Sequence, residues 1–363
     1  MIHLYRALSA LFPTRAMEAI PQRIALIHPC CIGDVVLATA ALKALRRGFP
    51  DAHITWGVGG WSRQAVADHP LLDAVLDTGP AANPAQGPAA MWRFARLLRN
   101  GSFDLVVSLV RSPWMSLAVA HSGIPNRAGP DSLGRGFGYT IRTRVNPQSA
   151  RHEAQIYLDV VRTLGIDTSG CYANVPVHDA DRQSMRGLLK EIGVTGDYVV
   201  VNPAGGSNPG MVMDAKRWPP QHFAALANAL ANQLGVRLVL IGGPQDGPLV
   251  ESVKVRINAA SAAFAGTLTF GQIAALAHDS HVYIGNDTGL THLAAAAGAR
   301  TVMIFGPSDP VRYAPFVPEA LALWKPVTLR GGADTGAPVD WDWLRDGITP
   351  EDAIPRVLDF LRR

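Results

Sequence analysis

Residues 24–47 read IALIHPCCIGDVVLATAALKALRR and connect a short apolar run to a longer apolar and basic segment. The run from Ile24 to His28 predicts a buried strand, Gly33-Asp34 predicts a turn, and Val35 to Arg47 predicts a helix. A strand, a loop and a helix in this order are typical of a parallel α/β sheet.

The same alternation occurs in both halves of the chain, and a length of 363 residues suggests about two domains. We therefore predict an α/β protein with two doubly wound, Rossmann-like domains that face a central crevice. The domains are expected at 1–175 and 176–345, with a closing helix in 346–363. Further strands are expected at 53–58, 74–76, 104–109, 198–202, 237–241, 282–284 and 301–305.

Composition narrows the class of protein and of ligand. Hydrophobic residues make up 48% and charged residues 17%, which is typical of a globular protein. A net charge of +4 favours anionic ligands. The three cysteines, Cys30, Cys31 and Cys171, form neither a disulfide framework nor an ordinary zinc set, so a reducing cytoplasm is expected.

The opening segment, residues 1–20, has neither the continuous apolar core of a signal peptide nor the length of a membrane span. Two uses remain open for it. It can form a short amphipathic helix on a membrane surface, or it can pack against its own domain, which is the favoured use.

Asp34 lies directly after the first predicted strand, where open α/β sheets usually bind ligands. A carboxylate at this place can accept a proton. An aspartate at a helix start also caps free N–H groups, which contributes about 1 kcal/mol. From position alone, the cap is the favoured role.

Two turns in the second half combine glycine with polar side chains. Gly205, Gly206 and Ser207 follow a strand, and Lys216 precedes the next helix, so the loop can admit a phosphate and neutralise it; an ordinary flexible loop is the alternative. It has neither P-loop spacing nor the Gly-x-Gly-x-x-Gly pattern, which counts against a nicotinamide enzyme.

The second turn, Asp287-Thr288-Gly289, precedes a helix whose free N–H groups and dipole suit a diphosphate. His292 follows on the first helical turn, although a lone histidine is more often a packed or surface residue. Asp340-Trp341-Asp342 resembles a metal motif but is interpreted as a surface loop, and no metal is predicted.

Arginines concentrate in a Gly, Arg and Pro-rich stretch, 127–147, that interrupts the strand and helix pattern. An acceptor with phosphate or carboxylate groups could bind there, or the arginines belong to a solvated loop. Nucleic acid is not expected, because interleaved aromatic side chains are missing. The arginines are Arg127, Arg135, Arg142 and Arg144, followed by Arg151.

In combination, three motifs resemble the ADP-heptose lipopolysaccharide heptosyltransferases of glycosyltransferase family 9. They are Gly33-Asp34, Lys216-Arg217-Trp218-Pro219 and Asp287-Thr288-Gly289-x-x-His292, and weaker similarity covers most of residues 22–316. Two features depart from the family pattern: His28 replaces a common Lys or Arg, and Cys30-Cys31 replaces a small polar pair.

The resemblance implies a GT-B fold and an inverting, metal-independent transfer of heptose from ADP-heptose to a lipopolysaccharide inner-core acceptor, with no cofactor. It implies a cytoplasmic enzyme, peripheral on the inner face of the inner membrane, whose partners are the nucleotide sugar and an anionic glycolipid. A nucleotide-sugar-binding module without transferase activity, or a transferase for another sugar, is the alternative.

The resemblance also implies residue roles. Asp34 becomes the general base, and Lys216 with the turn at Asp287 stabilises the departing diphosphate. Asp287 itself would repel phosphate, so it is expected to orient the turn or bind a donor hydroxyl. The donor set is Gly205, Gly206, Ser207, Lys216, Asp246, Leu268, Asp287, Thr288, Gly289 and His292. The acceptor set is Gly33, Arg127, Arg135 and Arg142.

Overall fold

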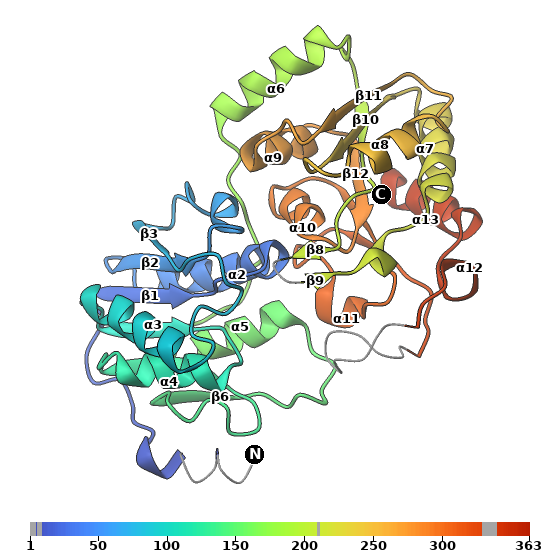
Figure 1. Cartoon of the computed structure of the whole chain (residues 1–363). Helices are drawn as coiled ribbons and strands as arrows, with labels where there is room; N and C mark the ends of the chain where they lie inside the picture. Colours follow the sequence, from blue (N-terminus) through green and yellow to red (C-terminus); the bar gives the residue numbers. More distant parts are fainter. Residues whose placement is uncertain (1–4, 6–8, 209–210, 329–339) are drawn as a thin grey trace. The chain divides into compact units, whose positions relative to one another are not determined.

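A computed structural model describes residue 5 and residues 9–208, 211–328 and 340–363. The chain divides into two compact units, Met1–Ala173 and Asn174–Arg363 (Figure 1). The expected boundary lay two residues later. The predicted closing helix packs within the second unit and forms no separate body.

The first unit contains a six-stranded parallel sheet in the order β3-β2-β1-β4-β5-β6. The central strand β1 is buried from its second residue onward, which explains its continuous apolar sequence. Helix α2 packs against α5, and α3 packs against α4 (Figure 1). The strands are β1 (Arg23–Ile27), β2 (His53–Val58), β3 (Ala74–Asp77), β4 (Leu105–Ser108), β5 (Asn126–Asp131) and β6 (Ile141–Arg144), and the helices are α2 (Ile32–Gly48), α3 (Pro88–Asn100), α4 (Pro113–His121) and α5 (Glu153–Arg162).

The second unit repeats this topology with a parallel sheet in the order β11-β10-β7-β12-β13-β14. A two-stranded hairpin, β8 (Ser207–Asn208) with β9 (Met211–Val212), follows β7. The sheet strands are β7 (Tyr198–Asn202), β10 (Arg237–Gly242), β11 (Ser261–Ala265), β12 (Val282–Asn286), β13 (Thr301–Ile304) and β14 (Leu321–Leu323). The helices are α6 (Asp179–Glu191), α7 (Pro220–Leu234), α8 (Gly247–Lys254), α9 (Phe270–His278), α10 (Gly289–Ala296), α11 (Pro310–Tyr313), α12 (Trp343–Asp346) and α13 (Pro350–Arg362).

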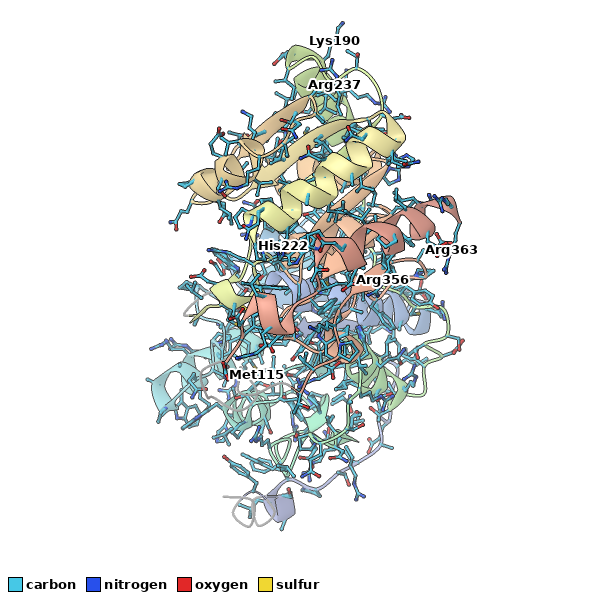
Figure 2. All side chains as sticks on the ribbon, turned by 90° about the vertical axis from the view of Figure 1, so that its right-hand side faces the viewer. Met115, Lys190, His222, Arg237, Arg356 and Arg363 are labelled. Carbon is cyan, nitrogen blue, oxygen red and sulfur yellow. A yellow bond between two sulfur atoms is a disulfide. The ribbon has the colours of Figure 1, made fainter. Side chains whose placement is uncertain are left out.

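The closing helix α13 buries one face against the second unit. Ala353 and Val357 of α13 share a hydrophobic core with Phe223 of α7. Figure 2 labels His222 on α7 and Arg356 on α13, the two helices that pack together there. The apolar spacing that predicted this helix therefore corresponds to its buried face.

Three elements lie in two stretches where none was predicted. The stretch 127–147 interrupts the alternation of strands and helices as expected, since no helix lies between β5 and β6, but these two strands extend the sheet at one edge. The passage near 167–182 is irregular as expected up to residue 178, and α6 starts at Asp179. Charged, glycine-rich edge strands and polar surface helices carry little apolar periodicity, so their sequences do not reveal them.

The opening segment packs against the first unit where it is described. The ring of Phe12 lies 6.0 Å from that of Phe137, and the Tyr5 ring stacks on Phe137 at 6.1 Å. The backbone N–H of Arg15 donates to the carbonyl of Thr140 at 3.0 Å. Packing on its own domain, the favoured expectation, is thus confirmed for these residues. Among the described helices, none is both long enough and apolar enough to span a bilayer.

Candidate active site

Asp34 lies at the carboxyl edge of the first sheet, in the first turn of α2. Helix α2 begins at Ile32 and Cys31 occupies its N-cap, so Asp34 is the third residue of the helix and not its N-cap residue. The position of an acidic group near the positive end of the helix favours its ionised form. Asp34 is half-buried, as is Gly33 beside it.

Tyr157 and His28 form a chain of hydrogen bonds that ends on Asp34. The hydroxyl of Tyr157 donates to Asp34 Oδ1 at 3.1 Å, and the same hydroxyl lies 3.1 Å from His28 Nε2. The side chains of Tyr157 and His28 are both buried. Tyr157 comes from α5 and His28 from the end of β1, so the packing of α2 on α5 assembles the chain.

The protonation states of this chain follow from burial. Burial lowers the pKa of His28 to about 4, against the attraction of the Glu153 carboxylate, so its imidazole is neutral at neutral pH. Burial, together with the charges of Asp34 and Glu153, raises the pKa of Tyr157 well above its usual value. The phenol therefore stays protonated and donates its hydrogen bond to Asp34. Because its single proton is used there, His28 Nε2–H is the donor to the phenol oxygen.

Arg111 and Glu153 form an ion pair at the same edge of the sheet. Arg111 Nη2 lies 2.7 Å from Glu153 Oε2, and the Glu153 side chain is 1% exposed while that of Arg111 is 30% exposed. Arg111 follows β4, the strand next to β1. The pair holds the guanidinium of Arg111 at the carboxyl edge of the sheet, where Asp34 also lies. A buried charge needs such a partner.

Cys30 and Cys31, which precede Asp34, are joined by a disulfide in the structure. The sequence predicted no disulfide framework, and a bridge between adjacent residues was not foreseen. Cys171 is a buried free thiol.

In the second unit, Lys216 and Asp287 form an ion pair at the end of β12. Lys216 Nζ lies 2.6 Å from Asp287 Oδ2, and His292 Nε2 lies 3.9 Å from Asp287 Oδ1. Burial alone raises the pKa of Asp287, but the charges of Lys216 and His292 and hydrogen bonds from Lys216 and Ser308 outweigh it and hold the pKa below its usual value. Asp287 is therefore ionised, and it orients Lys216.

The glycine loop after β7 lies against the start of α10. A Cβ on Gly205 would lie 2.1 Å from Thr288 Cγ2, and the backbone φ of Gly205 is +114°. A Cβ on Gly206 would lie 2.6 Å from the carbonyl of Met213. Thr288 occupies the N-cap of α10, but its side chain does not cap the helix. The loop and the helix start thus approach at a distance that only glycine permits.

Arg217 links the glycine loop to Asp246. Arg217 Nε donates to the carbonyl of Gly205 at 2.9 Å, and its Nη2 lies 3.8 Å from Asp246 Oδ1. Asp246 precedes α8 and accepts a hydrogen bond from the N–H of Gly243. Ser207 is exposed in the hairpin strand β8. Leu268 is half-buried in the segment before α9.

Comparisons with known proteins identify the family. Residues 91–329 match the model of "Glycosyltransferase family 9 (heptosyltransferase)", which is more than half of the chain. This chain belongs to glycosyltransferase family 9. It is 24% identical to lipopolysaccharide heptosyltransferase 3 of Escherichia coli over 298 residues, which cover 80% of this chain and 86% of that relative.

Solved structures of this family share the fold. The family 9 glycosyltransferase of Veillonella parvula superposes with a TM-score of 0.80 at 25% identity, over 96% of this chain and 99% of that chain. The ADP-heptose lps heptosyltransferase II of E. coli gives a TM-score of 0.70 at 20% identity, over 94% and 98%. The predicted GT-B fold, with two parallel six-stranded sheets, is confirmed.

Two of the three arginines in the acceptor set predicted for this family 9 chain donate hydrogen bonds to backbone carbonyls of the first unit. Arg127 donates to the carbonyls of Gly138 and Ile124 at 3.0 and 2.8 Å. Arg142 donates to the carbonyl of Tyr139 at 2.9 Å and also to those of Phe12 and Phe137. Arg135 is exposed, and its side chain makes no hydrogen bond or ion pair with the described residues.

The Asp340-Trp341-Asp342 segment has local structural roles in this family 9 chain. Asp342 caps α12 by accepting the N–H of Leu344 at 2.8 Å, and Asp340 lies 3.2 Å from the guanidinium of Arg345. The two carboxylates therefore already have partners, and the Asp340 side chain is 64% exposed. Within the described residues, no group of three or more His, Cys, Asp or Glu side chains is placed to hold a metal ion.

Sequence reasoning missed Tyr157, Arg111 and Glu153. The sequence signal for Glu153 was an acidic residue at the start of a predicted apolar helix, beside Arg151 and His152. The contact of Tyr157 with Asp34 joins residues 123 positions apart, and it becomes visible only once α5 is packed on α2.

Proposed function

We propose that this protein transfers heptose from ADP-heptose to a hydroxyl of the lipopolysaccharide inner core, with inversion at the anomeric carbon. Membership in family 9 and the activities for which the relatives are named support the donor and the acceptor class. The observation that carries the proposal is the Asp34 carboxylate at the carboxyl end of β1, oriented by Tyr157.

Asp34 acts as the general base. The acceptor hydroxyl attacks the anomeric carbon, its proton passes to Asp34, and the bond between that carbon and the ADP oxygen breaks. A single displacement of this kind inverts the configuration. The hydrogen bond from Tyr157 fixes one carboxylate oxygen and favours the ionised form that can accept the proton.

The second unit binds the donor and stabilises the departing ADP. Lys216 has two further ammonium protons beside the one directed at Asp287, and these are available to phosphate oxygens. The N–H groups at Thr288 and Gly289 and the positive end of α10 add to the attraction, and His292 lies on the same turn. These groups supply the positive charge, so the proposed reaction requires no metal ion.

The acceptor set Gly33, Arg127, Arg135 and Arg142 remains a proposal for the first unit. Arg135 is the member whose guanidinium has no hydrogen-bond or ion-pair partner among the described residues, so it is the strongest candidate for an anionic group of the glycolipid. We further propose a cytoplasmic enzyme that is peripheral on the inner face of the inner membrane. Nucleic acid is not a proposed partner.

A release assay tests this function. Purified protein receives ADP-heptose with and without a heptose-deficient lipopolysaccharide acceptor, and ADP release is followed for the wild type, Asp34→Asn and the control Asp51→Asn, which alters an exposed aspartate. We expect acceptor-dependent release in the wild type and the control, and its loss in folded Asp34→Asn. Full turnover by Asp34→Asn contradicts the assigned base.

The same assay separates the alternative functions. Tight ADP binding by calorimetry, without transfer to any of a panel of acceptors, supports a binding module of the same fold. Release from another ADP-sugar but not from ADP-heptose indicates a transferase for a different sugar.

A further inference from the structure

A cavity of about 880 Å³ lies in the first unit, beside the edge strand β6. Residues 14–17, 140–142 and 163–165 line it, together with Asp131 and Arg144. Strand β6 is three positions from β1 in the sheet, which is about 14 Å at ~4.8 Å for each strand. The cavity is therefore separate from the loop after β1 that carries the proposed base.

The lining of this cavity is positively charged. Arg15, Arg142 and Arg144 line it, and Asp131 is the acidic residue in the lining, so three positive charges minus one negative charge leave +2. Asp131 accepts the N–H of Gly136, which occupies one carboxylate oxygen. Arg144 is exposed, and its side chain makes no hydrogen bond or ion pair with the part of the chain that the structure describes.

Two of the lining arginines, Arg15 and Arg142, also repel a third arginine, Arg127, which does not line the cavity. Burial lowers the pKa of Arg127, and the charges of Arg15 and Arg142 lower it further. A group of like charges held together in this way favours the binding of an anion, since the anion relieves the repulsion. Arg144 and the remaining donors of Arg15 supply the hydrogen bonds that a phosphate oxygen accepts.

The segment that contributes residues 14–17 to the lining also exposes large apolar side chains. Leu11 is 71% exposed and Ile20 is 75% exposed, and they lie on either side of residues 14–17 in the chain. The segment is anchored to the unit through the contact of Phe12 with Phe137. Apolar side chains beside arginines are typical of surfaces that lie in the interface of a bilayer.

We propose that this cavity and the segment around residues 14–17 bind the phosphate headgroup of an anionic phospholipid at a bilayer surface. The arginines contact the phosphate, and Leu11 and Ile20 enter the acyl boundary. The inference deepens the proposed peripheral location but uses residues other than Asp34 and Lys216. Its test contains neither donor nor acceptor, so its failure is distinct from a failure of the transferase proposal.

The test is sedimentation of the full chain with vesicles of phosphatidylcholine, with or without one-third phosphatidylglycerol. The variants are Arg15→Glu and Arg144→Glu, and the matched control is Arg96→Glu, an equal charge change at an exposed arginine of α3 that does not line the cavity. We expect the wild type to bind only the anionic vesicles. Each unit of charge changes the partition coefficient about fivefold, and Arg→Glu changes the charge by two units. Arg15→Glu or Arg144→Glu should therefore lower partitioning onto anionic vesicles roughly 25-fold.

Three results would overturn the proposal. The first is equal binding of the wild type to both kinds of vesicle. The second is an equal loss in the Arg96→Glu control, which would mean that net charge alone decides. The third is saturable binding of inorganic phosphate, lost in Arg144→Glu, without binding to vesicles, which would assign the cavity to a free anion.

Discussion

Tyr157→Phe tests whether the hydrogen-bond chain orients and ionises the proposed base. The substitution removes the hydroxyl that lies 3.1 Å from both Asp34 Oδ1 and His28 Nε2 and leaves the ring in place. A hydrogen bond to a charged group contributes about 1.5–3 kcal/mol. If this energy is lost from the ionised base, kcat falls roughly 10- to 100-fold at low pH.

The pH dependence has a definite sign. The Tyr157 donor favours the charged carboxylate, so its removal shifts the acid limb of the pH–rate profile to higher pH, by about 1–2 units at 1.36 kcal/mol per unit. The assay is acceptor-dependent ADP release measured as kcat and KM between pH 5 and 9. The rate should recover partly on the alkaline side, where the base is ionised without help.

Tyr139→Phe is the matched control for this experiment. Tyr139 is also buried in the first unit, and its hydroxyl donates to Ser108 at 3.0 Å, away from Asp34. We expect both variants to lose about 1–3 kcal/mol of unfolding free energy, but only Tyr157→Phe to shift the acid limb. A folded Tyr157→Phe enzyme with the wild-type profile, or an equal shift in Tyr139→Phe, would refute the reasoning.

Three further predictions concern the paired and packed groups. Lys216→Met leaves buried Asp287 without its cation and should lower the unfolding free energy by about 3 kcal/mol in urea titration; unchanged stability would contradict the pairing. Gly205→Ala should weaken ADP binding, measured by calorimetry, at least tenfold. Gly60→Ala is the control, since no atom lies within 4 Å of its new Cβ, and it should leave the affinity unchanged. Equal affinities of the two variants for ADP would exclude the close approach. His28 is neutral in the folded state, where its pKa is about 4, but becomes protonated near its ordinary pKa of 6.5 in the unfolded state. Its contribution to the unfolding free energy should therefore fall by about 3 kcal/mol from pH 6.5 to pH 4. The unfolding free energy of His28→Gln should depend less steeply on pH, and equal slopes for the two proteins would refute the assignment.

The sequence revealed the fold wherever strands are buried on both faces. The runs at 24–27, 198–202 and 237–241 are almost entirely apolar because β1, β7 and β10 lie inside their sheets. Strand β6 has the sequence Ile-Arg-Thr-Arg at the edge of its sheet, and β5 contains glycine and proline. Neither pattern predicts a strand, so β5 and β6 were not predicted.

The candidate site was visible only in its local parts. Glycine and aspartate after a strand indicated the turns at Asp34 and Asp287, because a sharp turn at a sheet edge restricts the residue types that fit. The partners of these residues come from distant segments: Tyr157 reaches Asp34 across 123 positions, and Lys216 reaches Asp287 across 71. Such contacts depend on helix packing, which a single sequence does not encode in any local pattern.

The two units share one topology but have different proposed roles. In each sheet the first strand, β1 or β7, lies between the second and fourth strands of its unit, so the loops after the first and fourth strands start side by side. In the first unit those loops lead to Asp34 and Arg111. In the second they carry Gly205 and Thr288, which approach closely.

The length of the loop after the first strand accounts for this difference. Helix α2 starts five residues after β1 ends, between Ile27 and Ile32, so the carboxylate of Asp34 is fixed on a rigid helical turn against α5. The chain from Asn202 to Pro220 is longer and contains the glycine pair, the hairpin and Lys216, so Gly205 and the ammonium group of Lys216 both lie at the start of α10. A short connection positions a base, whereas a long, glycine-containing connection can surround an anion.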